Sequence, residues 1–298
     1  MTPLHPLLAH AEQQSYPASC LYVVATPIGN IADISFRALT VLAKVAAVAC
    51  EDTRNSAQLL KQLGLFKPLI AAHQHNENEV AQKIILRLQQ GESIALISDA
   101  GTPAVSDPGA RIVDAVRTAG FKVVPVPGAS AVISALSASG LLHEQFYFVG
   151  FLPSKAGQRD TALTQLLSVP ATLAFYEAPH RIVDTIAALT ALFPPERKIV
   201  FARELTKLFE EIHRCDLGQA ADWLKEDAHR EKGEYVLLLE GASADVDAEL
   251  TEARRVLEIL LTSCSVKQAA TLAAQLTGQK KNALYQLALV LHSGEVGS

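Results

Sequence analysis

Residues 98–109 (SDAGTPAVSDPG) contain the residue types that point most clearly to chemistry in this chain. Two glycines, two prolines and two aspartates follow an apolar run, residues 94–97, that is typical of a buried strand. An open α/β sheet binds its ligand beside the carboxyl ends of its strands. Gly101 and Gly109 can adopt positive φ angles and let a ligand approach the backbone, so this segment is predicted to line a ligand crevice. The alternative is an ordinary βα turn in which an aspartate caps the next helix.

Residues 73–79 (HQHNENE) are the best candidate for a metal site. Alternation along a strand would put two histidines and two glutamates on one face. The same letters also fit a strand that ends near Ala72, followed by an asparagine cap and two glutamates in the first turn of a helix. No further histidine or cysteine cluster completes a ligand shell, so we expect no metal.

Several enzyme classes are disfavoured by the motifs. The chain has no GxGxxG after a strand and no GxxxxGK[ST], which argues against a dinucleotide fold and a P-loop NTPase. Ser130 stands in GASA and not in GxSxG, so a serine hydrolase is not expected.

Composition predicts a globular protein of ordinary type. The chain has 298 residues, of which 49% are hydrophobic and 19% charged, which is enough for two domains with separate cores. No apolar run approaches the roughly 20 residues of a membrane span, so no membrane association is expected. Four widely separated cysteines without a CxxC pair predict reduced thiols and a cytoplasmic location. The net charge of −5 argues against a protein covered in basic residues but allows a local basic patch.

The elements that must position these residues are predicted by alternating apolar runs and helical periodicity. Strands are expected at 20–26, 46–50, 69–72, 93–98 and 122–126, then at 146–150, 171–177, 197–202, 209–214 and 234–240. Three helices should follow, at about 247–262, 265–276 and 279–292. We therefore predict a disordered tail (1–18), an N-terminal α/β domain (19–127), a C-terminal α/β domain (128–243) and a helical appendage (244–298).

Nine short motifs occur along the chain in a characteristic order. They are LYVVATPIGN (21–30), EDTR (51–54), HNE (75–77), the 98–109 segment, PGASA (127–131), FVGFLP (148–153), YEAPHR (176–181), RELTK (203–207) and KGEY (232–235). This order resembles the ribosomal RNA small subunit methyltransferase I family, a branch of the tetrapyrrole methylase superfamily, over residues 20–292. The resemblance implies an α/β fold of two domains with the donor cleft between them, plus a C-terminal appendage of helix-turn-helix type.

The resemblance also implies a function. The methyl donor would be S-adenosyl-L-methionine, and the reaction would be 2′-O-methylation of a cytidine ribose in 16S ribosomal RNA of the 30S subunit, by a homodimer. The donor positions carried over are Pro27, Ile28, Asp99, Thr102, Val105, Ser130, Ala131, Tyr176, Ala202 and Val236. The alternative for each of these residues is an ordinary role in core packing or in a turn, without contact to a ligand. Asp107 is assigned only to the start of the next helix.

Transfer from a sulfonium donor requires an aligned hydroxyl and removal of its proton. Glu177 is our first choice for the proton acceptor, with Arg181 and Glu204 as further catalytic candidates. The structural alternative for each is an ion pair or a helix cap, such as Glu204 with Lys207. RNA phosphates are expected to contact basic residues near the motif loops. The alternative is that these basic residues only form an ordinary solvated surface. These residues are Arg54, Lys155, Arg159, Arg203 and Lys207.

Two other functions stay open at this point. Residues 265–285 have a helix, a glycine turn and a second helix with a basic start, which is the pattern of a helix-turn-helix DNA regulator. A regulator would bind duplex DNA and turn over no donor, whereas a corrin or porphyrin methylase would methylate a macrocycle. The YEAPHR and EDTR motifs favour the RNA methyltransferase, with the tail as an RNA-docking or packing module.

Overall fold

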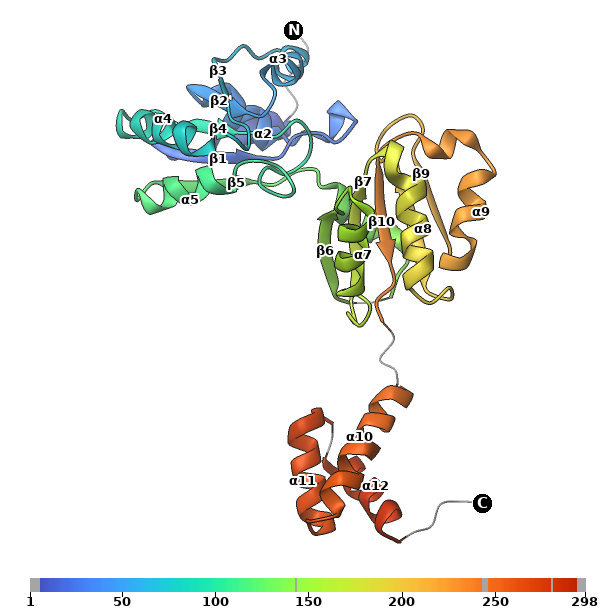
Figure 1. Ribbon diagram of the computed structural model, residues 1–298. Helices are drawn as coiled ribbons and strands as arrows, with labels where there is room; N and C mark the ends of the chain where they lie inside the picture. The colour runs from blue at the N-terminus through green and yellow to red at the C-terminus, as the bar shows by residue number, and fades with distance from the viewer. Residues whose placement is uncertain (1–5, 143, 243–245, 280, 294–298) are drawn as a thin grey trace. The chain divides into compact units, whose positions relative to one another are not determined.

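The computed structural model describes residues 6–142, 144–242, 246–279 and 281–293. The chain divides into two compact units, Met1–Leu167 with Ala171–Glu240, and Ser168–Pro170 with Gly241–Ser298. Both β-sheets belong to the first unit (Figure 1). None of the helices in the described part of the chain has both the length and the apolar character needed to cross a bilayer.

The first sheet is parallel throughout, with strand order β3-β2-β4-β1-β5. Its strands are β1 (Cys20–Val24), β2 (Ala47–Cys50), β3 (Leu69–Ala71), β4 (Ile94–Leu96) and β5 (Lys122–Val126). Its helices are α2 (Phe36–Lys44), α3 (Thr53–Gln62), α4 (Glu77–Gln89) and α5 (Ala110–Thr118). Two separate core clusters form, one with residues of α2 and α3 and the other with residues of α4 and α5. The helices therefore cover both faces, which explains why the strands are apolar runs without alternation.

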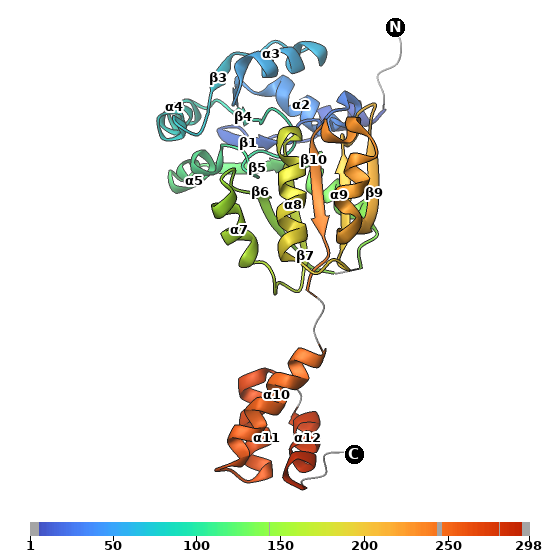
Figure 2. The same ribbon diagram turned by 45° about the vertical axis from the view of Figure 1, so that its right-hand side comes forward.

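The second sheet is mixed, with strand order β6-β7-β10-β8-β9. Its strands are β6 (Phe146–Phe151), β7 (Thr172–Glu177), β8 (Lys198–Arg203), β9 (Glu211–Asp216) and β10 (Tyr235–Leu239). Only β6 and β7 pair in parallel. Helix α6 (Ala131–Ser139) packs on one face, and Figure 2 shows α7 (Ala156–Thr164), α8 (Ile182–Leu192) and α9 (Ala220–Lys225) on the other. The predicted boundary between the two α/β domains, at residues 127 and 128, stays a prediction.

The second unit contains three helices, α10 (Val246–Leu261), α11 (Val266–Thr277) and α12 (Lys281–Ser293). Helix α11 begins with a capping box formed by Ser265 and Gln268 and ends at Gly278 in the left-handed conformation. Small side chains such as Ala269, Ala270 and Ala273 fill its core. The helices lie where the sequence predicts them, to within a few residues.

The N-terminal segment differs from its prediction. Pro6–Gln13 form a helix (α1), and Ala11 is buried. The Tyr16 hydroxyl donates to the Ala11 carbonyl at 2.8 Å, and Lys44 of α2 reaches the Glu12 carbonyl at 3.2 Å. The prediction of a disordered tail over residues 1–18 is therefore wrong for residues 6–18, because this segment finds tertiary partners on α2. Residues 1–5 lie outside the described part of the chain.

Candidate functional site

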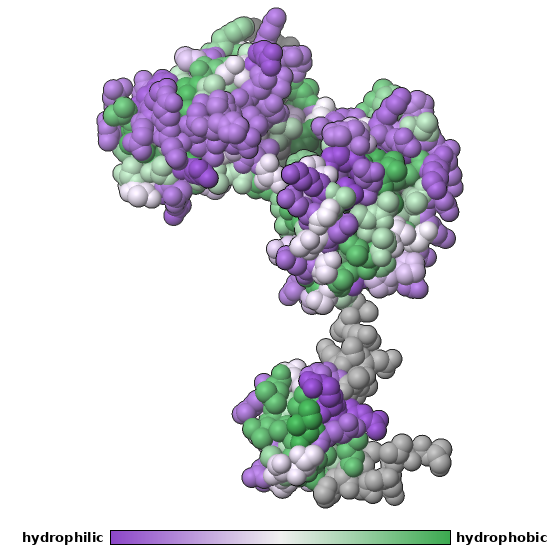
Figure 3. Space-filling model, viewed as in Figure 1, coloured by the Kyte–Doolittle hydropathy of each residue, from purple (hydrophilic) through white to green (hydrophobic). Residues whose placement is uncertain are grey.

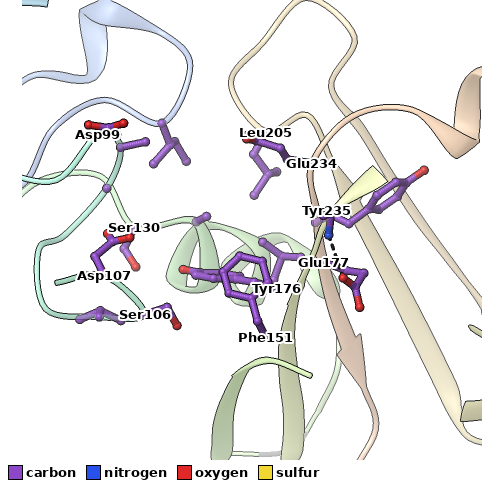
Figure 4. A pocket seen from close by; sticks show the side chains of 18 of the residues that line it. Asp99, Ser106, Asp107, Ser130, Phe151, Tyr176, Glu177, Leu205, Glu234 and Tyr235 are labelled. Carbon is purple, nitrogen blue, oxygen red and sulfur yellow. Dashed lines mark hydrogen bonds between the residues drawn. The ribbon is translucent and has the colours of Figure 1, made fainter. Parts of the chain in front are cut away.

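A cavity of about 330 Å³ lies between the loops that follow the first sheet's strands and the strands of the second sheet (Figure 4). Nine of the ten positions carried over for the donor line it, and the tenth, Pro27, does not. The nine are Ile28, Asp99, Thr102, Val105, Ser130, Ala131, Tyr176, Ala202 and Val236. The fold thus brings together residues that are separated by up to about two hundred positions in the sequence.

The 98–109 loop is held at both of its ends. Thr26 and Gly101 exchange backbone hydrogen bonds of 2.8 and 3.1 Å, which fix the loop against the end of β1. At the other end, the buried carboxylate of Glu77 accepts a 2.6 Å hydrogen bond from the Gly109 N–H. Ala104 and Ser106 have φ values of 67° and 62°, a left-handed conformation that disfavours both residue types. The loop is a rigid, strained wall of the cavity.

Glu77 belongs to residues 73–79, the segment considered above as a candidate metal site. Its carboxylate is buried against the 98–109 loop and does not face solvent with the histidines. Asn76 uses its side chain locally, accepting from the His73 N–H at 2.8 Å and donating to the Ala71 carbonyl at 3.0 Å. No cluster of three or more histidine, cysteine, aspartate or glutamate residues suited to a metal is present within the described ranges.

Two aspartates of the 98–109 loop face the cavity from one side (Figure 4). Asp99 accepts hydrogen bonds from the Asp52 N–H at 3.3 Å and from the Asn55 amide at 2.8 Å, which tie it to the start of α3. Asp107 is half-buried, and burial raises its pKa to about 6. A hydrogen bond with Ser98 lowers the pKa of Asp107, and the charges of Glu51 and Asp99 raise it.

Asp107 is one of several cavity residues outside the predicted donor set, and the only aspartate among them. Its sequence context, DPG before a helical pattern, indicated only a helix start. A second aspartate eight positions after Asp99, in a loop already predicted to bind a ligand, is the signal that could have found it.

An aromatic wall faces the aspartates from the second sheet. Tyr176 makes edge contacts with Phe148 and Phe151, at centroid distances of 5.0 and 5.6 Å. Its hydroxyl accepts a 3.3 Å hydrogen bond from the Val132 N–H, which ties β7 to the first turn of α6. Burial raises the pKa of Tyr176, so the ring is neutral at physiological pH. The cavity therefore has an acidic side and an apolar, aromatic side.

Residues 204–210, between β8 and β9, border the cavity through Leu205 and Lys207. The Lys207 ammonium lies 2.8 Å from both Glu204 Oε1 and Glu234 Oε2. Burial raises the pKa of Glu204, but the hydrogen bonds from Lys207 and the Glu234 N–H outweigh burial and leave that pKa below its usual value. Burial likewise lowers the pKa of Lys207, and its two carboxylate partners more than reverse the effect. Glu204 is thus a partner of Lys207, as the structural alternative proposed, and is not part of the cavity lining.

Two glycines beside the cavity, Gly29 and Gly150, are in close contact with residues of the opposite half of the unit. A Cβ atom at Gly29 would lie 2.5 Å from Cγ of Lys207. A Cβ atom at Gly150, on β6, would lie 2.9 Å from Oγ of Ser106. In both places the two halves of the unit approach closely because one partner has no side chain.

Glu177, the predicted proton acceptor, is one of the residues that line the cavity, but its side chain points away from it. Tyr176 and Glu177 are consecutive on β7, so their side chains point to opposite faces, as Figure 4 shows. The Glu177 side chain is 0% exposed and receives hydrogen bonds from the Thr185 hydroxyl at 2.6 Å and the Ala178 N–H at 2.9 Å. Arg181 Nε lies 3.1 Å from its Oε1. Glu177 and Arg181 therefore form an ion pair on the other face of β7, which favours a structural role for both side chains, and their assignment as catalytic groups stays a prediction.

The expected RNA contacts divide into buried and accessible residues. Arg159 and Arg203 are each only 8% exposed, which disfavours them as phosphate contacts, and their assignment stays a prediction. Arg203 donates to three backbone carbonyls, those of Lys232, Phe209 and His229. Lys155 is exposed, and the Arg54 side chain is 89% exposed beside Asp52. Lys207 lies at the cavity.

Comparison with known proteins identifies the family. Residues 20–221 match the family model of tetrapyrrole (corrin/porphyrin) methylases, and residues 247–292 match that of the RsmI C-terminal HTH domain. The ribosomal RNA small subunit methyltransferase I of Pseudomonas aeruginosa is 50% identical over 274 residues, which cover 91% of this chain and 97% of that protein. The protein of the same name from Escherichia coli O157:H7 is 47% identical over 269 residues, covering 90% and 94%.

Solved structures with a similar fold are more distant in sequence. The methyltransferase CobJ has a TM-score of 0.57 at 19% identity, with 75% of this chain and 94% of that chain covered. A uroporphyrin-III C-methyltransferase from Thermus thermophilus, solved with S-adenosyl homocysteine, has a TM-score of 0.52 at 18% identity, covering 74% and 97%. These likenesses confirm the predicted fold class, an α/β fold of the tetrapyrrole methylase type, which is followed here by a helix-turn-helix-like unit. The chain belongs to the ribosomal RNA small subunit methyltransferase I family, within the tetrapyrrole methylases.

Proposed function

We propose that this protein is an S-adenosylmethionine-dependent methyltransferase that methylates the 2′-hydroxyl of a cytidine ribose in 16S ribosomal RNA. The observation that carries the proposal is that nine of the ten donor positions line one cavity. The curated relatives named for small-subunit RNA methylation match about nine-tenths of the chain, which supports the same substrate class. The proposal includes action in the cytoplasm, on the 30S subunit or its RNA, as a homodimer.

The cavity residues fit such a donor. S-adenosylmethionine supplies an activated methyl group on a positively charged sulfur. Carboxylates of Asp99 and Asp107 on one side favour a cationic ligand, and the apolar side formed by Tyr176, Ala202 and Val236 suits a purine ring. A volume of about 330 Å³ falls within the range of small-molecule sites.

We assign the proton acceptor to Asp107 in place of Glu177. A carboxylate with a pKa of about 6 is largely ionised at neutral pH and is a stronger base than an ordinary aspartate. It lines the cavity, whereas the Glu177 carboxylate is occupied on the other face of β7. Asp107 would receive the proton of the 2′-hydroxyl as the oxygen–methyl bond forms and the sulfur–methyl bond of the donor breaks, which leaves the neutral thioether S-adenosylhomocysteine.

The test is incubation of the protein with donor labelled in its methyl group and either 30S subunits or free 16S RNA. Label is expected on one cytidine, and hydrolysis should locate it on the ribose and not on the base. Label on a base, or no label with either substrate while the donor still binds, would contradict the proposal. A porphyrin precursor in a parallel incubation tests the macrocycle alternative, and we expect no transfer to it.

A further inference from the structure

The tip of the 204–210 loop exposes two large apolar side chains. Leu208 is 89% exposed and Phe209 is 67% exposed. A single exposed apolar residue is ordinary on a protein surface, but two adjacent ones beside a ligand cavity are a candidate contact surface. We call Leu208 and Phe209 the apolar tip.

The loop is built to hold this tip outward. Its backbone carries hydrogen bonds from the Lys207 N–H to the Glu204 carbonyl at 3.0 Å and from the Glu210 N–H to the Lys207 carbonyl at 3.1 Å. The Glu210 carboxylate accepts from the Thr206 N–H at 2.6 Å, and Arg203 donates to the Phe209 carbonyl at 3.3 Å. These hydrogen bonds stabilise the loop conformation in which the two apolar side chains of the tip face outward.

The tip stands directly beside the cavity. Leu205 and Lys207, which precede it, both line the cavity, and Lys207 packs against Gly29 of the first half. A ribose that presents its 2′-hydroxyl to Asp107 must lie in this cavity. Its own base and the neighbouring base are then drawn out of any stacked helix, and each exposes an apolar face.

Aromatic side chains beside a cation are the usual partner of an unstacked base. The tip offers an aromatic ring at Phe209 and an aliphatic side chain at Leu208, directly after Lys207 in the chain. We propose that the apolar tip is a platform on which an unstacked base of the substrate RNA packs, with Phe209 stacking on it and Leu208 covering the edge of the stack. This inference rests on the proposed RNA substrate and adds the residues that would hold it.

The first experiment removes the platform. In the double variant Leu208→Ala/Phe209→Ala, the KM for RNA should rise by about 10- to 100-fold, because base stacking on an aromatic side chain is worth that factor. The affinity for the donor and the value of kcat should change by less than about threefold, since the tip does not line the cavity. Phe66→Ala is the matched control, because Phe66 is 83% exposed and lies in the first half, between α3 and β3. This control should leave KM unchanged.

The second experiment does not depend on turnover. The chain has one tryptophan, Trp223, which is 6% exposed. In a Phe209→Trp variant, an added 16S RNA fragment should quench the new fluorescence, and a Phe66→Trp variant should show no quenching. Unchanged KM in the double alanine variant of an active enzyme, or no quenching in the Phe209→Trp variant, would overturn the platform.

Two further outcomes separate the RNA platform from a contact between copies of the chain and from the proposed reaction. If the double alanine variant sediments as a smaller species than the wild type, the tip joins two copies of the chain and the RNA platform is wrong. If the wild type transfers no methyl group to RNA but the Phe209→Trp variant is still quenched, the proposed reaction fails and the base platform stands.

Discussion

The 98–109 loop brings carboxylates to the cavity, whereas the 204–210 loop brings an ion-pair network and an apolar tip. Both loops hold non-glycine residues in the left-handed conformation, and four of the five such residues among those described lie in these two loops. They are Ala104, Ser106, Glu204 and Thr206. Backbone strain concentrated in two segments that meet at one cavity indicates function more than packing.

The surroundings of the two loops differ as well. In the view of Figure 3, the first half of the unit is mostly hydrophilic, while hydrophobic residues gather in patches on the second half. This comparison suggests a division of tasks, in which the first loop acts on a small charged ligand and the second contacts a large one.

The largest effect should come from the chemistry of the first loop. Asp107→Asn removes the proposed proton acceptor, and kcat should fall by about 100-fold or more. The wild-type rate should decline as the pH falls through about 6, where Asp107 becomes protonated, and the variant should lose this dependence. Steady-state rates between pH 5 and 8 measure both effects. Asp114→Asn, an exposed change on α5, should retain the wild-type profile.

The same variant has an opposite effect on stability. The pKa of Asp107 is higher in the folded chain than in the unfolded chain, so its contribution favours folding below about pH 4 and is lost as the pH rises through about 6. Asp107→Asn should therefore raise the Tm at pH 8 relative to the wild type. A rate and a Tm that both stay unchanged would remove Asp107 from the mechanism.

The next effect concerns the support of the second loop. Arg203→Met leaves three backbone carbonyls without their donor in a buried setting, and the free energy of unfolding should fall by about 3 kcal/mol. Urea titration measures this change. Arg54→Met, at a side chain that is 89% exposed, should change stability by less than about 0.5 kcal/mol. Equal losses in the two variants would mean that Arg203 is not what holds the 204–210 loop.

Glu177→Gln should show a smaller effect of a different kind. The variant keeps a hydrogen-bonding side chain but loses the charge opposite Arg181, so stability should fall by about 1 to 2 kcal/mol. Its kcat should stay within about threefold of the wild type. A 100-fold loss of kcat in a folded variant with normal donor affinity would restore Glu177 as the base.

The smallest effect tests the strain itself. Ala104→Gly relieves the left-handed conformation and should stabilise the protein by about 0.5 to 1 kcal/mol, since glycine loses part of the gain through its greater freedom in the unfolded chain. Ala187→Gly, at an exposed position in the interior of α8, should destabilise by about 1 kcal/mol in the same assay. If both variants are less stable than the wild type, Ala104 is not strained.

The sequence predicted the elements well because their signals are local. Apolar runs such as 94–97 and the spacing of the helices determine where strands and helices form, whatever lies elsewhere in the chain. The assembly of the cavity could be anticipated only through the family resemblance, since Ile28 and Val236 have no local signal that links them.

Side-chain direction is the feature in which the structure and the predicted site differ most. Strand alternation places Tyr176 and Glu177 on opposite faces, so only one of them can line the cavity with its side chain, and this could have been recognised from the sequence. The burial of Arg159 and Arg203 could not have been recognised from the sequence. Arg159 lies beside residues of α8, and Arg203 donates to carbonyls that are distant in the chain. The cavity position of Asp107 depends on two left-handed residues of types that rarely adopt that conformation.

The contacts at Gly29 and Gly150 have a consequence for the size of the group transferred. The two halves approach each other closely at these positions, where a single added methyl group would meet Lys207 or Ser106. If these contacts hold the two halves together, the absence of two side chains limits the width of the cavity in which the proposed donor would bind. Donor analogues with an ethyl or propargyl group in place of methyl meet this limit directly, and alanine at either glycine should widen the range of alkyl groups that fit.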